Sequence, residues 1–249
     1  MSNPLITFLF PCKLLETSKN VLEELFSSFL YHSAEIKDQV EFIIKIDNGD
    51  YLTFSEITRI KEARPELNIK TIQFGEWENR NSIHLFYQYL VFFINPNTRF
   101  VGFISDDLQF YRDMNFILAK YKTDPKYFIL YTPEHFYPPR EHYTTEKELN
   151  NALWTENYPI VSVELLKLVN LGVIINIDSY FSLLNMILIQ NHGIDLKQPI
   201  EGWARRHGEN IFRKDDSSFG FNANSIKTIP SIALNILEEN AKSIAYRMK

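Results

Sequence analysis

FVGFISDDLQF, residues Phe100–Phe110, is the stretch that decides the fold. Its apolar, β-prone first part predicts a buried strand, which ends in Ser105, Asp106 and Asp107. Two adjacent carboxylates at the end of a buried strand repel each other and lose hydration, unless a cation lies between them. A helix cap or a solvated loop is the alternative for such a pair. We therefore expect a cation site at this strand end.

The sequence before this strand alternates between apolar runs and helical patterns. Near-continuous apolar runs of this kind predict strands that are covered on both faces, and their alternation with helices predicts parallel βαβ units. Ligands of such sheets bind at the carboxyl ends of the strands, where DNGD (Asp47–Asp50) and the SDD triplet both lie. The expected strands are Leu5–Phe10, Val40–Ile46, Ile69–Phe74 and Phe100–Ser105, and the expected helices are 21–30, 54–63 and 81–94.

The second half of the chain is less regular. We expect a strand followed by an aromatic and proline-rich loop over 127–143, and a short strand and helix over 159–172. A helix over 178–193 would have Asp178 or Ser179 as its N-cap and end at Gly193. The polar segment 200–220 predicts a loop, and Ser231–Tyr246 predicts an amphipathic helix. Without an internal repeat or a low-complexity linker, we expect residues 1–249 to form a single domain.

Composition narrows the class of protein. Of the 249 residues, 45% are apolar and 14% aromatic, which is typical of a folded globule. The net charge of −5 comes from interspersed charges without a basic block, so we expect no nucleic-acid partner. Cys12 alone forms neither a disulfide framework nor a cysteine-built zinc site, which favours a cytoplasmic protein. The apolar runs are too short for a membrane span.

The carboxylate pair also indicates which cation to expect. Mg²⁺ and Mn²⁺ prefer oxygen ligands and usually bind through one or two carboxylates together with substrate phosphates. Such an ion at Asp106 and Asp107 would remove the repulsion and bring a diphosphate with it.

Three segments resemble glycosyltransferases of the GT-A fold, especially the family-2-like group. They are PLITFLFPCK through KIDNGD, then ENRNSIHLFYQYL, then FVGFISDDLQF. The resemblance covers residues 4 to 112 and implies an α/β Rossmann-like domain whose mainly parallel sheet is flanked by helices. It assigns about 1–112 to nucleotide-sugar binding and about 113–249 to the acceptor side.

Within that resemblance, five residues take positions that bind the nucleotide. Asp47, at the end of the second strand, would accept from the base or ribose, and Phe10 and Pro11 would form a wall for the base. Arg80 and Asn81 would contact the base or the diphosphate, and a guanidinium fits phosphate oxygens bidentately. The alternatives are a solvated loop charge for Arg80 and simple core packing for Phe10 and Pro11.

The DXD-like triplet departs from the usual pattern. Ser105 holds the first place, where such enzymes have an acid that contacts the ribose, although a hydroxyl also hydrogen-bonds a sugar. Asp106 takes the middle place, and Asp107, the retained last acid, is the expected ligand of Mn²⁺ or Mg²⁺.

The second half supplies the remaining candidates. Inverting transfer needs a general base for the acceptor hydroxyl, and Asp178 fits that position, with Glu201 as a second candidate. Helix capping is the alternative for Asp178. In the 200–220 segment, His207 would complete the metal shell and Arg206 would hold the leaving diphosphate, unless the histidine is simply exposed.

The expected function is a metal-dependent, hexosyltransferase-like and inverting glycosyltransferase. It would move a sugar from a nucleotide-diphosphate donor to a glycan or other hydroxyl acceptor. The alternative is an inactive GT-A-like domain that binds nucleotide sugar or glycan, because Ser105 replaces an acid and Asp178 lacks the usual preceding Glu. A nucleotidyltransferase ranks lower, because it would have a glycine-rich loop after the first strand, where this chain has PCKLLETSK.

Overall fold

The strands of the N-terminal half form where the apolar runs are most continuous. A computed structural model of the chain gives β1 (Ile6–Pro11), β2 (Val40–Ile46), β3 (Ile69–Gln73) and β4 (Phe100–Phe103). It describes residues 4–14, 20–75, 83–106, 108–110, 112–114, 126–132, 157–171, 177–198, 204–206 and 231–248. Every residue of β1 and β4 is buried, as expected of strands covered on both faces.

These strands belong to a seven-stranded sheet with the order β3-β2-β1-β4-β7-β6-β8. The first four strands are parallel, β7 is antiparallel to both β4 and β6, and β6 is parallel to β8. The later strands are β6 (Ile129–Thr132), β7 (Asn157–Ser162) and β8 (Lys197–Gln198). The prediction of a mainly parallel sheet in an α/β fold is confirmed.

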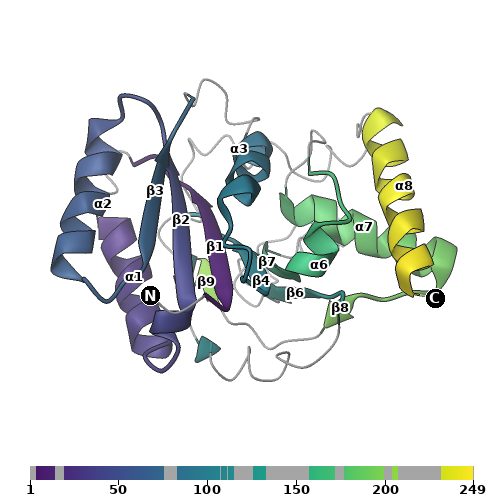
Figure 1. The fold of residues 1–249 in the computed structure, drawn as a ribbon, viewed down its shortest axis with the longest axis horizontal. Helices are drawn as coiled ribbons and strands as arrows, with labels where there is room; N and C mark the ends of the chain where they lie inside the picture. Colours follow the sequence, from purple (N-terminus) through teal and green to yellow (C-terminus); the bar gives the residue numbers. More distant parts are fainter. Residues whose placement is uncertain are drawn as a thin grey trace, which may run out of the picture.

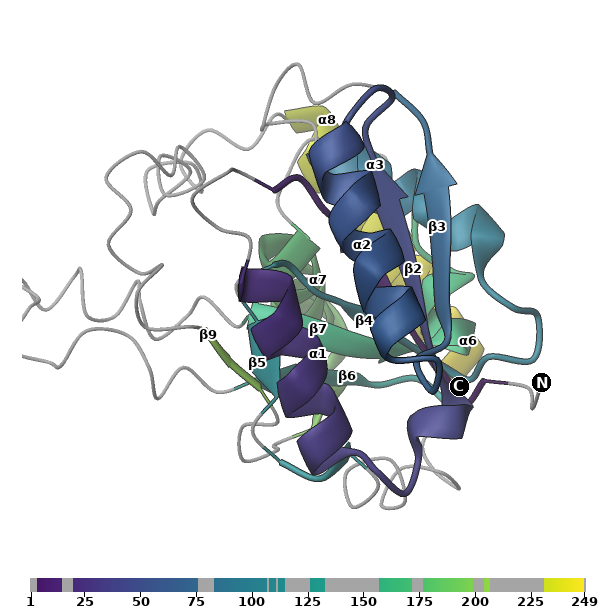
Figure 2. The ribbon, with the colours of Figure 1, turned by 90° about the vertical axis from the view of Figure 1, so that its left-hand side faces the viewer.

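Helices cover both faces of the sheet (Figure 1). On one face lie α1 (Asn20–His32) and α2 (Tyr51–Ala63), which Figure 2 shows from the front. On the other lie α3 (Ile83–Leu90) with its 3₁₀ turn η4 (Val91–Phe93), α6 (Val163–Leu166), α7 (Ile177–His192) and α8 (Ser231–Met248). No helix among the described residues is long and apolar enough to cross a bilayer.

The sheet divides the interior into two cores, because successive side chains of a strand point to opposite faces. On β2, Phe42 and Ile44 join the core under α1 and α2, whereas Ile43 joins the core under α3, α7 and α8. Gly102 on β4 lies against the ring of Phe8, with which any Cβ at that position would clash. The ring of Phe8 therefore occupies the space that a side chain at position 102 would need, which favours a glycine there.

Several element boundaries differ from those predicted. α2 begins at Tyr51 rather than Phe54, because Asp50 caps it by accepting from Thr53 N–H at 3.0 Å. The helix expected over 81–94 ends at Leu90 and continues as η4. In the segment expected to be a loop, β9 (Ala204–Arg206) pairs antiparallel with β5 (Leu108–Phe110).

The ends of α7 were predicted with mixed success. The helix begins at Ile177, so the backbones of Asp178 and Ser179 are already helical and neither residue is the N-cap. At the other end, Gly193 has a φ of 67° and donates to Ile189 C=O, while Ile194 donates to Leu188 C=O. The first of these bonds, from the N–H of a glycine in the left-handed conformation to a carbonyl four residues back, is that of an αL C-cap, which confirms Gly193 as the end of the helix.

Candidate functional site at the strand ends

The end of β2 holds a carboxylate between two lysines. Lys45 and Asp47 are two residues apart, so they point to the same face of the sheet. The Lys45 ammonium forms an ion pair with Asp47 Oδ1, and Lys13 Nζ lies 3.1 Å from Oδ2. Lys45 is fully buried and the Asp47 side chain is 4% exposed, whereas the Lys13 side chain is 44% exposed. Only Lys13 of the two lysines reaches solvent.

The buried ammonium of Lys45 is also covered by aromatic rings. Its Nζ lies 3.8 Å from the ring centroid of Phe86 on α3 and 5.5 Å from that of Phe74. The negative faces of these rings attract a cation most strongly where water is excluded. A carboxylate and two rings therefore compensate the buried charge, which would otherwise cost several kcal/mol.

The DNGD turn after β2 is fixed at both ends. Asn48 N–H donates to Gly75 C=O at 2.9 Å, which ties the turn to the end of β3. Gly49 has a φ of 77°, a conformation that suits glycine. Asp50 accepts from both the N–H and the hydroxyl of Thr53, at 3.0 and 2.6 Å, and thereby joins the turn to α2.

The end of β4 carries hydroxyl groups, whereas the carboxylate at the end of β2 lies between two lysines. Ile104 N–H donates to Leu9 C=O, so the pairing with β1 continues one residue beyond the strand. The Ser105 hydroxyl donates to the Tyr158 hydroxyl at 3.4 Å. Tyr158 has a φ of 52°, a left-handed conformation that costs about 1–2 kcal/mol in a residue with a side chain, and strain of this kind occurs often at functional sites.

The pairing of β1 with both β2 and β4 brings these strand ends to the same edge, and the electrostatics of Cys12 agree with it. Burial raises the pKa of its thiol well above the ordinary value, and the charges of Asp106, Asp50 and Asp47 raise that pKa further. Three carboxylates, from the end of β4, the start of α2 and the end of β2, therefore lie around the end of β1. Because β1 is parallel to both β2 and β4, all of them occupy the carboxyl edge of the sheet.

The β5–β9 pair brings a distant segment to this region. β5 follows the SDD triplet directly, and its Leu108 is paired with Arg206 of β9. The backbone of Arg206, the expected diphosphate clamp, therefore lies beside Leu108, which is two residues along the chain from Asp106. Sequence reasoning gave no signal for this pairing, because β9 is short and polar.

The predicted site residues fall into three groups. Asp47, Ser105 and Asp106 lie together at the carboxyl edge. Phe10 is fully buried in the core beneath α1 and α2, and Pro11 is buried as well, which favours the core-packing alternative over a wall for the base. For Asp178 and Arg206 the structure describes the backbone only, and the residues outside the described ranges are Arg80, Asn81, Asp107, Glu201 and His207.

The donor chemistry at the carboxyl edge suits a hard cation. The described part of the chain contains no group of three His, Cys, Asp or Glu side chains that would hold a metal. Carboxylate oxygens are nevertheless the ligands that Mg²⁺ and Mn²⁺ prefer, and Asp106 supplies such oxygens just after β4. Asp47 is a poorer candidate, since both of its oxygens already accept from lysines. The carboxylate of Asp106 at the β4 end therefore has the ligand chemistry that a divalent cation prefers.

Sequence reasoning overlooked Lys13 and Lys45. A signal for Lys45 was present: it is the one basic residue in the strand VEFIIKI and lies two positions before Asp47. A lysine inside a doubly covered strand needs a buried partner, and the nearest acid on its own face is that aspartate. Lys13 had no such signal, because only the fold brings it to Asp47.

Comparisons with known proteins identify the fold. No protein-family model matches the chain. No curated protein matches it either. Many solved structures are similar, and three of them, at 12–14% identity, have TM-scores of 0.51 to 0.56.

The first is the mannosyltransferase PcManGT from Pyrobaculum calidifontis, in complex with GDP-Man and Mn²⁺. It has a TM-score of 0.53 and 14% identity, over 97% of this chain and 70% of that one. The second is residues 1–349 of S. aureus TarS, with a TM-score of 0.56 and 12% identity, over 98% and 91%. Against a longer TarS chain, the match spans 36% of that chain.

The third is a 4-diphosphocytidyl-2C-methyl-D-erythritol synthase from Anaerococcus prevotii. It has a TM-score of 0.51 and 14% identity, over 84% of this chain and 93% of that one. At such identities a likeness defines the fold alone. The chain has the fold of the GT-A-type glycosyltransferases.

Proposed function

We propose that this protein is a metal-dependent glycosyltransferase that transfers a sugar from a nucleotide-diphosphate donor to a glycan or other hydroxyl acceptor. One observation carries the proposal: on a GT-A-type fold, Asp47, Asp50 and Asp106 all follow strands that pair parallel with β1, so they lie at the carboxyl edge of the sheet. Ligands of open α/β sheets bind at this edge. The similar structure of PcManGT contains GDP-Man and Mn²⁺, which supports the same classes of ligand here.

In this proposal the β4 end holds the cation. Asp107 would be its protein ligand, with His207 completing the shell and Asp106 beside them. A divalent cation supplies positive charge that stabilises a diphosphate leaving group. Ser105 would donate to a ribose or sugar hydroxyl, and Arg206, Arg80 and Asn81 would bind the phosphates or the base.

The acceptor side would be formed by the second half of the chain, about 113–249. Asp178 is the proposed general base, with Glu201 as the second candidate, in an inverting transfer. The N-cap alternative does not apply to Asp178, because its backbone is already helical. The single cysteine is a buried free thiol, which suits a reducing, cytoplasmic compartment.

Binding is tested by screening nucleotide sugars for a thermal shift, with and without Mn²⁺. A ligand that binds the native state raises its apparent stability. We expect one class of nucleotide sugar to raise the melting temperature in Mn²⁺ but not in EDTA. Asp107→Asn should abolish that dependence with little change in the unliganded melting temperature. If Asp107→Asn bound the same donor as tightly as the parent, the metal assignment would be wrong.

Turnover separates an enzyme from an inactive binding domain. Loss of a general base lowers the rate by about 10²–10⁴-fold and leaves donor affinity unchanged, because the base acts in the transition state. We therefore expect Asp178→Asn to lose transfer and to retain the Mn²⁺-dependent thermal shift. Unchanged turnover would move the base to Glu201, and a parent protein that binds donor without releasing nucleoside diphosphate would be a binding domain.

A further inference from the structure

We propose that Lys13 binds the diphosphate of the donor, and that Asp47 positions Lys13 rather than contacting the nucleotide itself. This inference rests on the proposed function and adds a second cationic contact to it, on the opposite side of β1 from the SDD triplet. It starts from the network formed by Lys13, Asp47 and Lys45, which neither the fold nor the predicted metal site explains.

The backbone on both sides of Lys13 is held in place. Cys12 N–H donates to Lys45 C=O at 2.9 Å, and Leu14 N–H donates to the Thr53 hydroxyl at 2.9 Å. Cys12 is fully buried and Leu14 is 4% exposed, so both neighbours of Lys13 in the chain are packed in the interior. A lysine placed this way loses little further backbone entropy when it binds a ligand.

The side chain of Lys13 is held as well. Its Nζ lies 3.1 Å from Asp47 Oδ2, while the other oxygen of that carboxylate accepts from the buried Lys45. Within this network of two ammonium groups and one carboxylate, the net charge is positive. Because Lys45 is fully buried, the positive charge is presented to solvent by Lys13 alone of the two.

A phosphate fits this arrangement chemically. An ammonium group has three N–H donors, and the bond to Asp47 uses one of them. The nearby carboxylates of Asp106 and Asp50 repel an approaching anion, so a diphosphate at this edge needs cations on more than one side. A divalent cation at the β4 end and Lys13 at the β1–β2 end would hold it from both sides. The leaving nucleoside diphosphate gains negative charge when the sugar departs, so Lys13 should favour product over donor.

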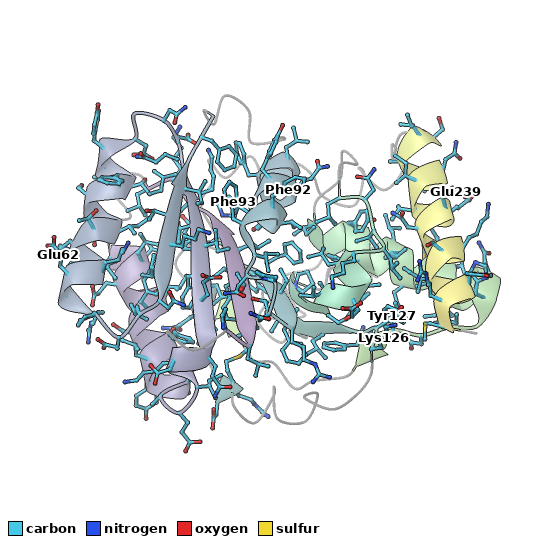
Figure 3. All side chains as sticks on the ribbon, viewed as in Figure 1. Glu62, Phe92, Phe93, Lys126, Tyr127 and Glu239 are labelled. Atoms are coloured by element: carbon cyan, nitrogen blue, oxygen red, sulfur yellow. The ribbon has the colours of Figure 1, made fainter. Side chains whose placement is uncertain are left out.

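The experiment measures calorimetric affinities of GDP, UDP and inorganic pyrophosphate for the parent and two variants, in Mn²⁺ and in EDTA. Lys13→Met removes the ammonium and keeps the apolar stem. Lys61→Met is the matched control, because it removes one exposed positive charge near the other end of α2. Its neighbour Glu62 is labelled on the outer side of that helix in Figure 3.

We expect Lys13→Met to weaken the nucleoside diphosphate that the parent binds by about 10- to 100-fold, the range for a charge-assisted hydrogen bond. Pyrophosphate should weaken equally, the corresponding free nucleoside should not change, and Lys61→Met should behave as the parent. The dependence of log Kd on salt should become shallower in Lys13→Met, because one phosphate contact is lost.

Three outcomes overturn the inference, and they differ in what else they imply. If the parent binds a nucleoside diphosphate and Lys13→Met binds it equally well, the Lys13 contact is wrong and the proposed function stands. If the parent binds none of the three probes in either buffer, both fail. Lys13→Arg keeps the charge, so it should retain most of the affinity; loss in Lys13→Arg equal to that in Lys13→Met would also contradict a charge-based role.

Discussion

The ends of β2 and β4 lie on either side of β1, yet they treat an aspartate in different ways. At the β2 end, Asp47 is almost fully buried and lies between the ammonium groups of Lys13 and Lys45. At the β4 end, Ser105 donates to the Tyr158 hydroxyl, and the half-buried Asp106 adds to the effect of burial in raising the pKa of the Cys12 thiol. The same residue type thus stands in a cationic setting on one strand and beside hydroxyls and other acids on the next.

This difference distinguishes an aspartate that orients neighbouring side chains from aspartates suited to binding a metal ion. The charge of Asp47 is compensated inside the protein, so its carboxylate orients the lysines. The acidic β4 end is suited to compensation from outside, by the divalent cation that we propose. We infer that a strand-end aspartate reveals its role through its neighbours rather than through its position.

The largest expected effect is on stability at the β2 end. Asp47→Asn leaves the Lys45 ammonium buried without its carboxylate, and breaking a buried pair in this way costs about 3–5 kcal/mol. Urea unfolding should show that loss, whereas Asp106→Asn, at the half-exposed β4 end, should cost less than about 1 kcal/mol. Equal losses for the two substitutions would contradict the distinction between the two strand ends.

A double substitution tests whether Lys45 and Asp47 are energetically coupled. Asp47→Asn leaves the Lys45 ammonium buried without its carboxylate, and Lys45→Met removes that ammonium. Methionine fills a similar volume among the rings of Phe74 and Phe86. The Lys45→Met/Asp47→Asn protein should therefore recover about 2 kcal/mol or more of the loss in Asp47→Asn. If the two free-energy changes simply added, Lys45 and Asp47 would not be coupled.

The pH dependence of stability reports on the burial of the Cys12 thiol and on the three carboxylates that act on it. Its pKa is raised in the folded state, so the folded thiol keeps its proton where the unfolded thiol loses it. This contribution is fully present below the ordinary thiol pKa and is lost as pH rises toward the raised value, by about 1–2 kcal/mol from pH 8 to pH 10. Cys12→Ala should lose correspondingly less stability over that range, and identical pH profiles would contradict the raised pKa.

The smallest expected effect concerns the hydroxyl pair at the β4 end. Ser105→Ala removes a donor that we propose for a ribose or sugar hydroxyl, and one such hydrogen bond contributes about 1 kcal/mol, or roughly a fivefold change in affinity. Calorimetry with the donor found in the screen should show that change, with the melting temperature preserved. An unchanged donor affinity would leave Ser105 as a structural partner of Tyr158 alone.

How much the sequence could predict depended on how locally each feature is encoded. β2 was predicted residue for residue, because five β-branched or aromatic residues in seven positions, ending at DNGD, leave little choice. β9 was not, because its pairing with β5 joins segments nearly a hundred residues apart and has no local pattern. The convergence of Asp47 and Asp106 followed from the parallel topology, whereas the Lys13–Asp47 contact depends on the path of the chain after β1. For Phe10, an apolar residue near a strand end, the sequence did not distinguish packing in the core from contact with a nucleotide base.

The decisive measurement compares diphosphate binding by the parent and by Lys13→Met, each with and without Mn²⁺. The account holds that the diphosphate is bound through Lys13 at the β1–β2 end and through a divalent cation at the β4 end. We would titrate the nucleoside diphosphate into the parent and Lys13→Met, each in Mn²⁺ and in EDTA. The account predicts that Mn²⁺ strengthens binding in both proteins and that Lys13→Met is weaker in both buffers. Binding that is independent of Mn²⁺ in the parent, or of Lys13 in both buffers, would contradict it.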